Sequence, residues 1–234
     1  MRCLHCGWEC PEGARFCGGC GKPLTPSIHP IPSGAEKVVF RQYIASGNVD
    51  EVVALLETGE KRYKQAFVEA IKEVASTTNI LGFLSQLIET GGAHSLISCL
   101  DGVRALIELD ALPYLPLVVL CEEKIARMAE NMEQAVAAEY FVSLLMVYRD
   151  YGMYFFRREE WTSAIPFLKA WLEKIMVVND LSMESASRVA VAQQLSAAIS
   201  LLGIACSSAA EAGESSEDWT GIEEIMRKAL SAVF

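Results

Sequence analysis

Two closely spaced pairs of cysteines near the N-terminus constrain this chain more than any other feature. Cys3 and Cys6 form the first pair and Cys17 and Cys20 the second, with two residues inside each pair and ten between the pairs. A tight turn between paired cysteines aims both thiolates at one metal ion, and two such turns complete a tetrahedron. In an intracellular chain the pattern predicts one Zn²⁺ held by four thiolates. Because four protein ligands leave no position for water, the expected zinc is structural and not hydrolytic.

The residues around these pairs have a recognisable arrangement. A glycine follows each pair, and the segment also contains Pro11-Glu12-Gly13 in the turn, Phe16 before the third cysteine, and Leu24 at its end. With these features, residues 1–22 resemble the short zinc-ribbon family found at the N-termini of many prokaryotic proteins. The resemblance implies that the metal ligands are Cys3, Cys6, Cys17 and Cys20. The same thiolates also bind iron, so a rubredoxin-like iron site or an iron–sulfur cluster stays open as an alternative.

Two further metal-binding side chains lie close to these ligands. His5 lies inside the first turn, where its side chain is expected to point outward, and Cys10 follows that turn closely. We therefore do not assign either residue as a ligand, because four thiolates already close a structural zinc site.

A proline-rich linker, residues 23–34, separates the ribbon from the rest of the chain. It holds four of the eight prolines, namely Pro23, Pro26, Pro30 and Pro32. Such a segment favours extended geometry and acts as a semi-rigid spacer.

The remaining residues, 35–234, have the apolar spacing of helices and no sustained alternation typical of strands. Gly47 and Gly59 mark the ends of the first two predicted helices. Further helices are predicted over residues 60–76, 78–90, 94–109, 113–130, 132–157, 160–178, 182–211 and 218–233. The body is therefore expected to be all-α.

The last hundred residues contain two similar segments. The first has Tyr148-x2-Tyr151-Gly152-x2-Phe155 followed by Ala164-x3-Leu168, and the second has Ile199-x2-Leu202-Gly203-x2-Cys206 followed by Ile222-x3-Met226-x2-Ala229. Residues 136–233 thereby resemble the tetratricopeptide family of helical-hairpin repeats. The resemblance implies a solenoid in which Gly152 and Ala164 let two antiparallel helices approach closely. The sequence departs from the family at Trp171, which stands where a small residue is expected, and in the spacing of the two glycines, which are 51 positions apart.

A helical solenoid of this kind presents a groove formed by the first helix of each repeat. Four residues of the first segment share one helix face and are candidates for contacting a partner: Arg149, Met153, Phe156 and Arg157. They could receive an acidic or apolar peptide. The alternative is that Met153 and Phe156 are core residues and that the arginines pair with nearby carboxylates.

Charge and hydropathy limit the classes of function. The whole chain has a net charge of −10. Residues 1–34 contain three basic and two acidic residues and so contribute +1, which leaves a net charge of −11 on the other 200 residues. Such a body repels phosphate backbones, which argues against nucleic acid as its ligand. No apolar run reaches the roughly 20 residues of a membrane span, and the N-terminus does not resemble a signal peptide, so a cytoplasmic protein is expected.

These observations favour an adaptor or accessory subunit over an enzyme. His94, the one histidine of the body, has no partnered nucleophile in the sequence, and no phosphate-binding glycine loop is present. Two alternatives remain: a regulatory protein whose ribbon contacts DNA or RNA, and an electron-transfer accessory with iron at the four cysteines. The mean hydropathy of +0.25 and the apolar last helix, which ends at Phe234, also predict burial of that helix against another protein or a second copy.

Overall fold

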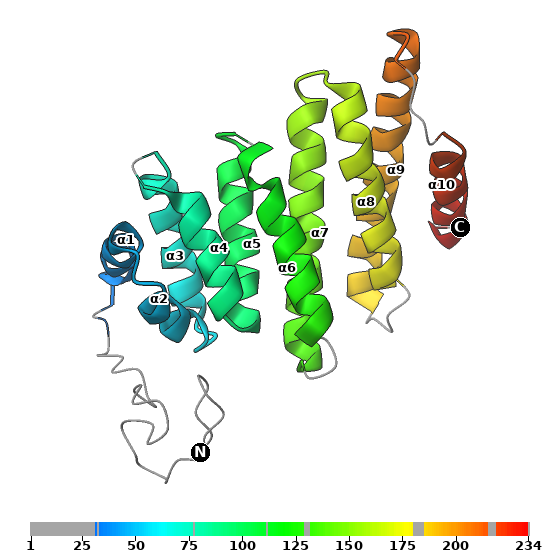
Figure 1. The fold of residues 1–234 in the computed structure, drawn as a ribbon. Helices are drawn as coiled ribbons and strands as arrows, with labels where there is room; N and C mark the ends of the chain where they lie inside the picture. Colours follow the sequence, from blue (N-terminus) through cyan, green and yellow to red (C-terminus); the bar gives the residue numbers. More distant parts are fainter. Residues whose placement is uncertain are drawn as a thin grey trace. The chain divides into compact units, whose positions relative to one another are not determined.

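The computed structural model describes residues 31, 33–76, 78–110, 112–128, 132–179, 185–214 and 219–233. All regular secondary structure in these ranges is helical, which confirms the all-α prediction for the body. Figure 1 shows the helices in chain order. The predicted ribbon and almost all of the linker lie outside the described residues. The chain divides into two compact units, Met1–Ser95 and Leu96–Phe234.

The first unit contains four helices that end close to the predicted positions. They are α1 (Glu36–Ser46), α2 (Val49–Leu56), α3 (Lys61–Val74) and α4 (Ile80–Thr90). Gly47 and Gly59 lie in the turns after α1 and α2 with φ angles of 72° and 71°, a region that glycine adopts without strain. The predicted helix stops are therefore confirmed.

The core of the first unit is aromatic where α1 meets α3. The Phe40 ring lies edge-on to Tyr63 and Phe67, with centroid distances of 6.3 Å and 5.7 Å. Edge-to-face pairs of this kind add to the stabilisation from buried area. Since all three rings are buried, they fix the pairing of α1 with α3.

Within the first unit, a carboxylate directly after α2 binds the first residues of α5 (Ala93–Ile107). Glu57 Oε1 accepts hydrogen bonds from the Gly92 amide at 2.9 Å, the Ser95 amide at 2.9 Å and the Ser95 hydroxyl at 2.5 Å. Amides at a helix start have no partner within the helix, so this side chain acts as a cap supplied from a distant segment.

The second unit contains the longer helices. After α5 come a short 3₁₀ turn, η1 (Leu112–Tyr114), and then α6 (Leu115–Met128), α7 (Gln134–Phe156), α8 (Trp161–Asn179), α9 (Ser185–Glu211) and α10 (Trp219–Val233). The predicted helix 113–130 thus becomes α-helical only at Leu115. Pro113 and Pro116 explain this start, because proline lacks the backbone N–H and fits best in the first turn of a helix, where that N–H would have no partner within the helix.

The pair α7 and α8 packs closely at Gly152, as the sequence predicted. A Cβ atom at this position would lie 2.6 Å from Leu168 Cδ2 and 3.3 Å from the Leu168 amide nitrogen. Ala164 and Leu168 are fully buried. Next to them the Phe167 ring stacks on Tyr151 and Phe155, with centroid distances of 5.0 Å and 5.5 Å.

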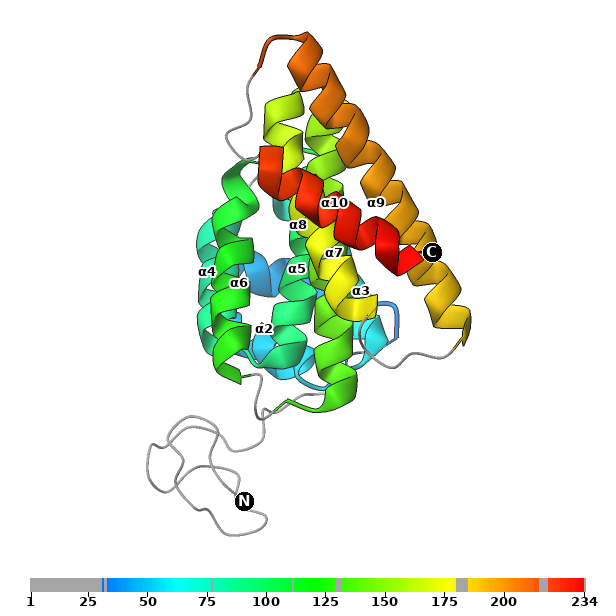
Figure 2. The same cartoon turned by 90° about the vertical axis from the view of Figure 1, so that its right-hand side faces the viewer.

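The helices that follow repeat this packing more loosely. Helix α8 also contacts α9 and α10, and Figure 2 shows α10 lying alongside both. At Gly203 the nearest atom to an added Cβ would be Met226 Cε at 3.5 Å, an ordinary contact. Trp171, which departs from the repeat pattern, is 1% exposed, so the large side chain is accommodated in the core of this unit. A repeated solenoid remains a prediction.

Candidate functional site

The four predicted zinc ligands, Cys3, Cys6, Cys17 and Cys20, lie outside the described residues. Among the residues that are described, no group of three or more His, Cys, Asp or Glu side chains is arranged to hold a metal ion. The zinc site therefore stays a prediction from the spacing and chemistry of the cysteines.

The predicted partner-contacting residues lie along the C-terminal half of α7 and in the turn after it. Arg157 follows the last residue of α7 and is exposed, whereas Arg149, Met153 and Phe156 are half-buried. The structure therefore brings all four residues to one end of the helix. Their surroundings differ, however, and decide what each can contribute.

Arg149 is engaged by its own neighbour. Its Nε and one terminal nitrogen donate to Asp150 Oδ1 at 2.9 Å and 2.7 Å. The other Asp150 oxygen accepts from Arg104 Nε of α5 at 2.9 Å. Arg149 thus belongs to a charge cluster between α5 and α7, and part of its charge is already neutralised.

Phe156 contacts the start of the next helix. Its ring lies edge-on to Trp161 with a centroid distance of 5.3 Å. The sequence left open that the arginines pair with nearby carboxylates and that Phe156 is a core residue. Arg149 does pair with Asp150, and Phe156 does pack on Trp161. Both side chains nevertheless keep some exposed surface.

The exposed face of α7 extends further toward its N-terminus than the sequence analysis proposed. Val142 is 52% exposed and Met146 is half-buried. Together with three of the predicted residues they follow one another at steps of four and three, which places all five on one side of a helix. We call this set the α7 stripe: Val142, Met146, Arg149, Met153 and Phe156. The same spacing was present in the sequence, but the repeat motif that drew attention to α7 begins only at Tyr148.

The opposite side of α7 is held rigidly. Tyr140, Leu144, Val147, Tyr151 and Phe155 are all buried. A polar cluster adds to this: the Tyr148 hydroxyl donates to Glu122 of α6 at 2.7 Å, and Lys174 of α8 donates to the same carboxylate at 2.6 Å. Burial, together with the bond to Glu122, raises the pKa of Tyr148 well above its usual range. The α7 stripe is therefore presented by a helix fixed against α6 and α8.

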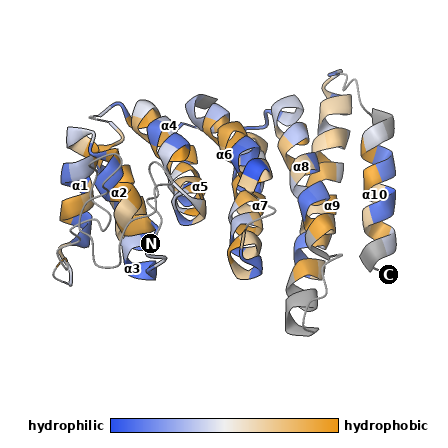
Figure 3. Cartoon of the chain, turned by 60° about the horizontal axis from the view of Figure 1, so that its bottom comes forward, coloured by the Kyte–Doolittle hydropathy of each residue, from blue (hydrophilic) through white to orange (hydrophobic). Residues whose placement is uncertain are grey.

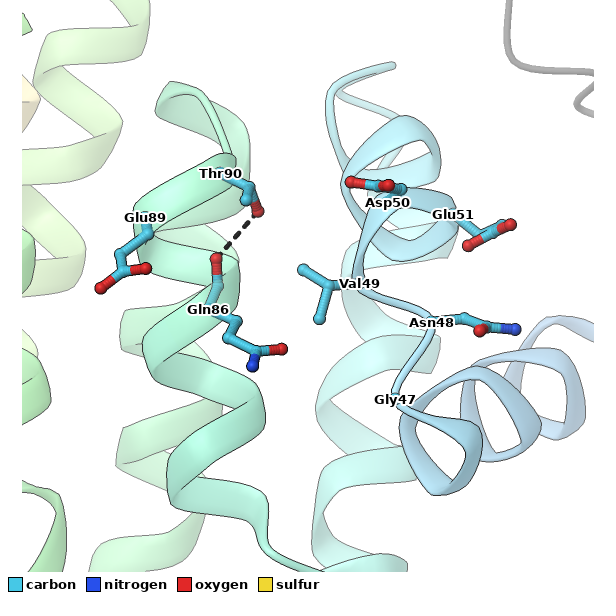
Figure 4. Close-up of a pocket in the computed structure, with 8 residues that line it drawn as sticks. All are labelled: Gly47, Asn48, Val49, Asp50, Glu51, Gln86, Glu89 and Thr90. Carbon is cyan, nitrogen blue, oxygen red and sulfur yellow. Dashed lines mark hydrogen bonds between the residues drawn. The ribbon is translucent and has the colours of Figure 1, made fainter. Parts of the chain in front are cut away.

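The first unit has an open pocket of about 420 Å³ between α2 and α4. It is lined by polar and acidic side chains, among them Asp50, Glu51, Gln86 and Glu89. In Figure 4 the carboxylates of Glu51 and Glu89 point away from each other. The pocket therefore does not gather its acidic groups toward a common ligand.

The last described helix, α10, is amphipathic, as Figure 3 shows by its mixture of hydrophilic and hydrophobic residues. Ile222 and Ala229 are buried, whereas Leu230 is exposed. Its outer face carries Glu223, Glu224, Arg227 and Lys228, and Lys228 pairs with Glu224 at 2.8 Å. The side chains of Trp219, Val233 and Phe234 lie outside the description, so the predicted self-association through this helix stays a prediction.

Helix α9 carries few charged side chains over its length. The stretch Val191–Glu211 is long enough and apolar enough to cross a membrane by length and composition. The sequence predicted no such segment, because no uninterrupted apolar run is long enough, whereas this stretch mixes leucine and isoleucine with alanine and serine. One side of α9 is buried within the second unit through Leu195, Ala198, Leu202, Ala205 and Ala209. About 28% of the apolar stretch is buried in the described part of the chain, so α9 both packs on one side and leaves most of its length exposed.

Comparison of the chain with family models, with curated proteins and with solved structures finds no match.

Proposed function

We propose that this protein is a non-catalytic, zinc-binding adaptor that holds a protein partner through the α7 stripe. The observation that carries the proposal is the stripe itself, in which partly exposed apolar side chains lie on a helix whose other side is buried. Binding to a preorganised surface avoids the entropy cost of ordering it, and methionines adapt to the shape of the partner.

The chemistry of the stripe indicates the kind of partner. Val142, Met146 and Met153 offer apolar contact, and the exposed guanidinium of Arg157 lies at one end. The fitting partner is a peptide segment with apolar residues spaced along one side and an acidic residue near the Arg157 end.

The first test of this proposal is a charged substitution at Val142, the most exposed apolar residue of the α7 stripe and its N-terminal member. Val142→Glu places a carboxylate where the partner is expected to bury apolar surface, and the loss expected at such a contact is about 2 kcal/mol or more, roughly thirty-fold in affinity. Val38→Glu on α1 is the matched control, because Val38 is 50% exposed and Val142 is 52% exposed. Partners retained by wild type and V38E but lost by V142E support the proposal. Equal capture by all three proteins would contradict it.

The zinc ribbon is proposed as the second part of the adaptor. Its support is the ligand set, four thiolates at tetrahedral-site spacing. Metal analysis of the purified protein should give about one zinc per chain, as one tetrahedral site requires. Iron at that stoichiometry would instead favour the electron-transfer alternative.

A further inference from the structure

Helix α9 has an outer side that stays exposed in the described part of the chain. Residues 189–210 contain no Asp, Glu, Lys or Arg, the longest such stretch in a chain whose body is strongly acidic. Helix α10 packs against α9 but, as Figure 2 shows, covers only part of its length. Six exposed residues of α9 follow one another at steps of four and three. We call this set the α9 face: Gln193, Ala197, Ser200, Ile204, Ser207 and Glu211.

The spacing of the α9 face indicates what fits it. Steps of four and three place side chains on one straight seam, the arrangement by which two helices pair along their length. When two copies of one helix pair antiparallel about a two-fold axis, the numbers of facing residues have a constant sum. With the axis beside Ser200, Ile204 of one copy faces Ala197 of the other. The large side chain, which is 50% exposed in the single chain, then meets a small one on both sides of the axis.

The charges at the C-terminal end of α9 select the antiparallel arrangement. Glu211 ends the α9 face and Glu214 follows it, and both residues are exposed. A parallel pair would bring the carboxylates of both copies together at one end. An antiparallel pair separates them and places them near the start of the other copy's α9 at Ser185, where the free backbone amides carry partial positive charge.

The buried side of α9 favours a protein partner over a lipid bilayer. Leu195, Ala198 and Leu202 are packed in the core of the second unit, so α9 would have to leave that core to cross a membrane. The α9 face itself carries one large apolar side chain, Ile204, among serine, alanine and polar residues. An interfacial helix needs a larger apolar side than this, whereas a second helix packs closely on small residues.

We propose that the α9 face binds the α9 face of a second copy of this chain, with the two helices antiparallel. At 1.5 Å per residue, the seam from position 193 to position 211 is about 27 Å long. A contact of one helix per copy is small compared with the interfaces of permanent dimers, so the dimer should exchange with monomer at micromolar concentrations. The proposal does not rest on the α7 stripe, which lies on a different helix.

Sedimentation equilibrium of the full chain over a range of concentrations measures this association. Ile204→Glu places a carboxylate at both ends of the seam and should weaken association by about ten-fold or more. Val177→Glu on α8 and Leu230→Glu on α10 are the matched controls, because these residues are 56% and 44% exposed. Both control proteins should associate like wild type, and L230E also separates this contact from self-association through α10.

Substitutions at Ser200 test the position of the axis, because a residue beside a two-fold axis faces its own copy. Ser200→Arg and Ser200→Glu should each weaken self-association through like charges, and a mixture of the two proteins should restore the dimer. Circular dichroism checks that both variants remain helical. A photoreactive amino acid at position 197, in a mixture of isotopically labelled and unlabelled chains, should attach near position 204 of the other copy.

Several results would overturn the proposal. They are a wild-type protein that stays monomeric throughout the micromolar range, an I204E protein that associates like wild type, and a mixture of S200R and S200E that does not pair. Attachment from position 197 to position 197 of the other copy would show a parallel pair and would equally overturn it. So would a monomeric protein that binds phosphatidylglycerol vesicles and loses this binding in I204E, because lipid would then be the ligand of the α9 face.

Discussion

Replacing Gly152 by alanine tests the contact on which the pairing of α7 with α8 depends. The new Cβ would lie 2.6 Å from Leu168 Cδ2, 3.0 Å from Leu168 Cγ and 3.3 Å from the Leu168 amide nitrogen. Leu168 is fully buried and cannot turn into solvent, so the two helices must move apart or the leucine must leave its rotamer. Overpacking of this kind costs about 1–3 kcal/mol.

The same substitution also has a favourable effect, which must be subtracted. Alanine in the middle of a helix is favoured over glycine by about 1 kcal/mol. Because the close contacts include a backbone atom, we expect a cost in the upper half of the overpacking range and a net loss of about 1–2 kcal/mol for G152A. Gly203→Ala is the matched control, since its nearest contact is 3.5 Å from Met226 Cε, and it should gain about 1 kcal/mol from helix propensity.

Urea denaturation followed by circular dichroism measures both changes, provided that the slope m is unchanged. The double variant G152A/L168A provides a further check, because removing the leucine removes the clash. Leu168→Ala should therefore cost less in the G152A background than in wild type, with a coupling energy of about 1–2 kcal/mol. If G152A and G203A stabilise the protein equally, the close approach of α7 and α8 is wrong.

Three further predictions concern other parts of the molecule. Glu57→Ala should lower the free energy of unfolding by about 1–3 kcal/mol, because it removes the acceptor of three hydrogen bonds at the start of α5. A denaturant titration measures this loss, and Glu51→Ala, at an exposed position, is the control that should change the free energy of unfolding little. Burial raises the pKa values of Tyr140, Tyr148 and Tyr151, whereas unfolded tyrosine ionises at about pH 10, so unfolding releases protons above that pH and stability should fall as pH rises further. Replacing all three by phenylalanine should remove most of this alkaline loss of stability, and an unchanged loss in that variant would contradict the prediction. Cys17→Ser should lower the bound zinc and leave the helical circular dichroism nearly unchanged, because the proline-rich linker separates the ribbon from the body; a cooperative loss of helix would refute that independence.

The helices could be predicted from the sequence because their signals are local. Apolar spacing and the glycines at positions 47 and 59 gave the ends of α1 and α2 closely, and the motif around Gly152 identified a close approach that the structure confirms. These features depend on residues a few positions apart, or on one helical hairpin.

The side-chain partners could not be predicted because they join distant segments. Asp150 pairs with Arg104 across 46 positions, and Glu57 caps a helix that begins more than 30 residues later. Val142 and Met146 are a different case, since their helical spacing with Met153 was visible in the sequence and was missed because the repeat motif starts after them.

A photo-crosslinking measurement tests most directly whether the α7 stripe binds a partner. A photoreactive amino acid is placed at position 142 in one protein and at position 38 in another, and each is irradiated in extract of its native cell. The two positions have nearly equal exposure, so nonspecific collisions should label both alike. We expect a discrete crosslinked partner from position 142, suppressed by unlabelled wild-type protein but not by V142E, and none from position 38. Equal crosslinking from both positions, or none from position 142, would contradict the proposed adaptor function of this surface.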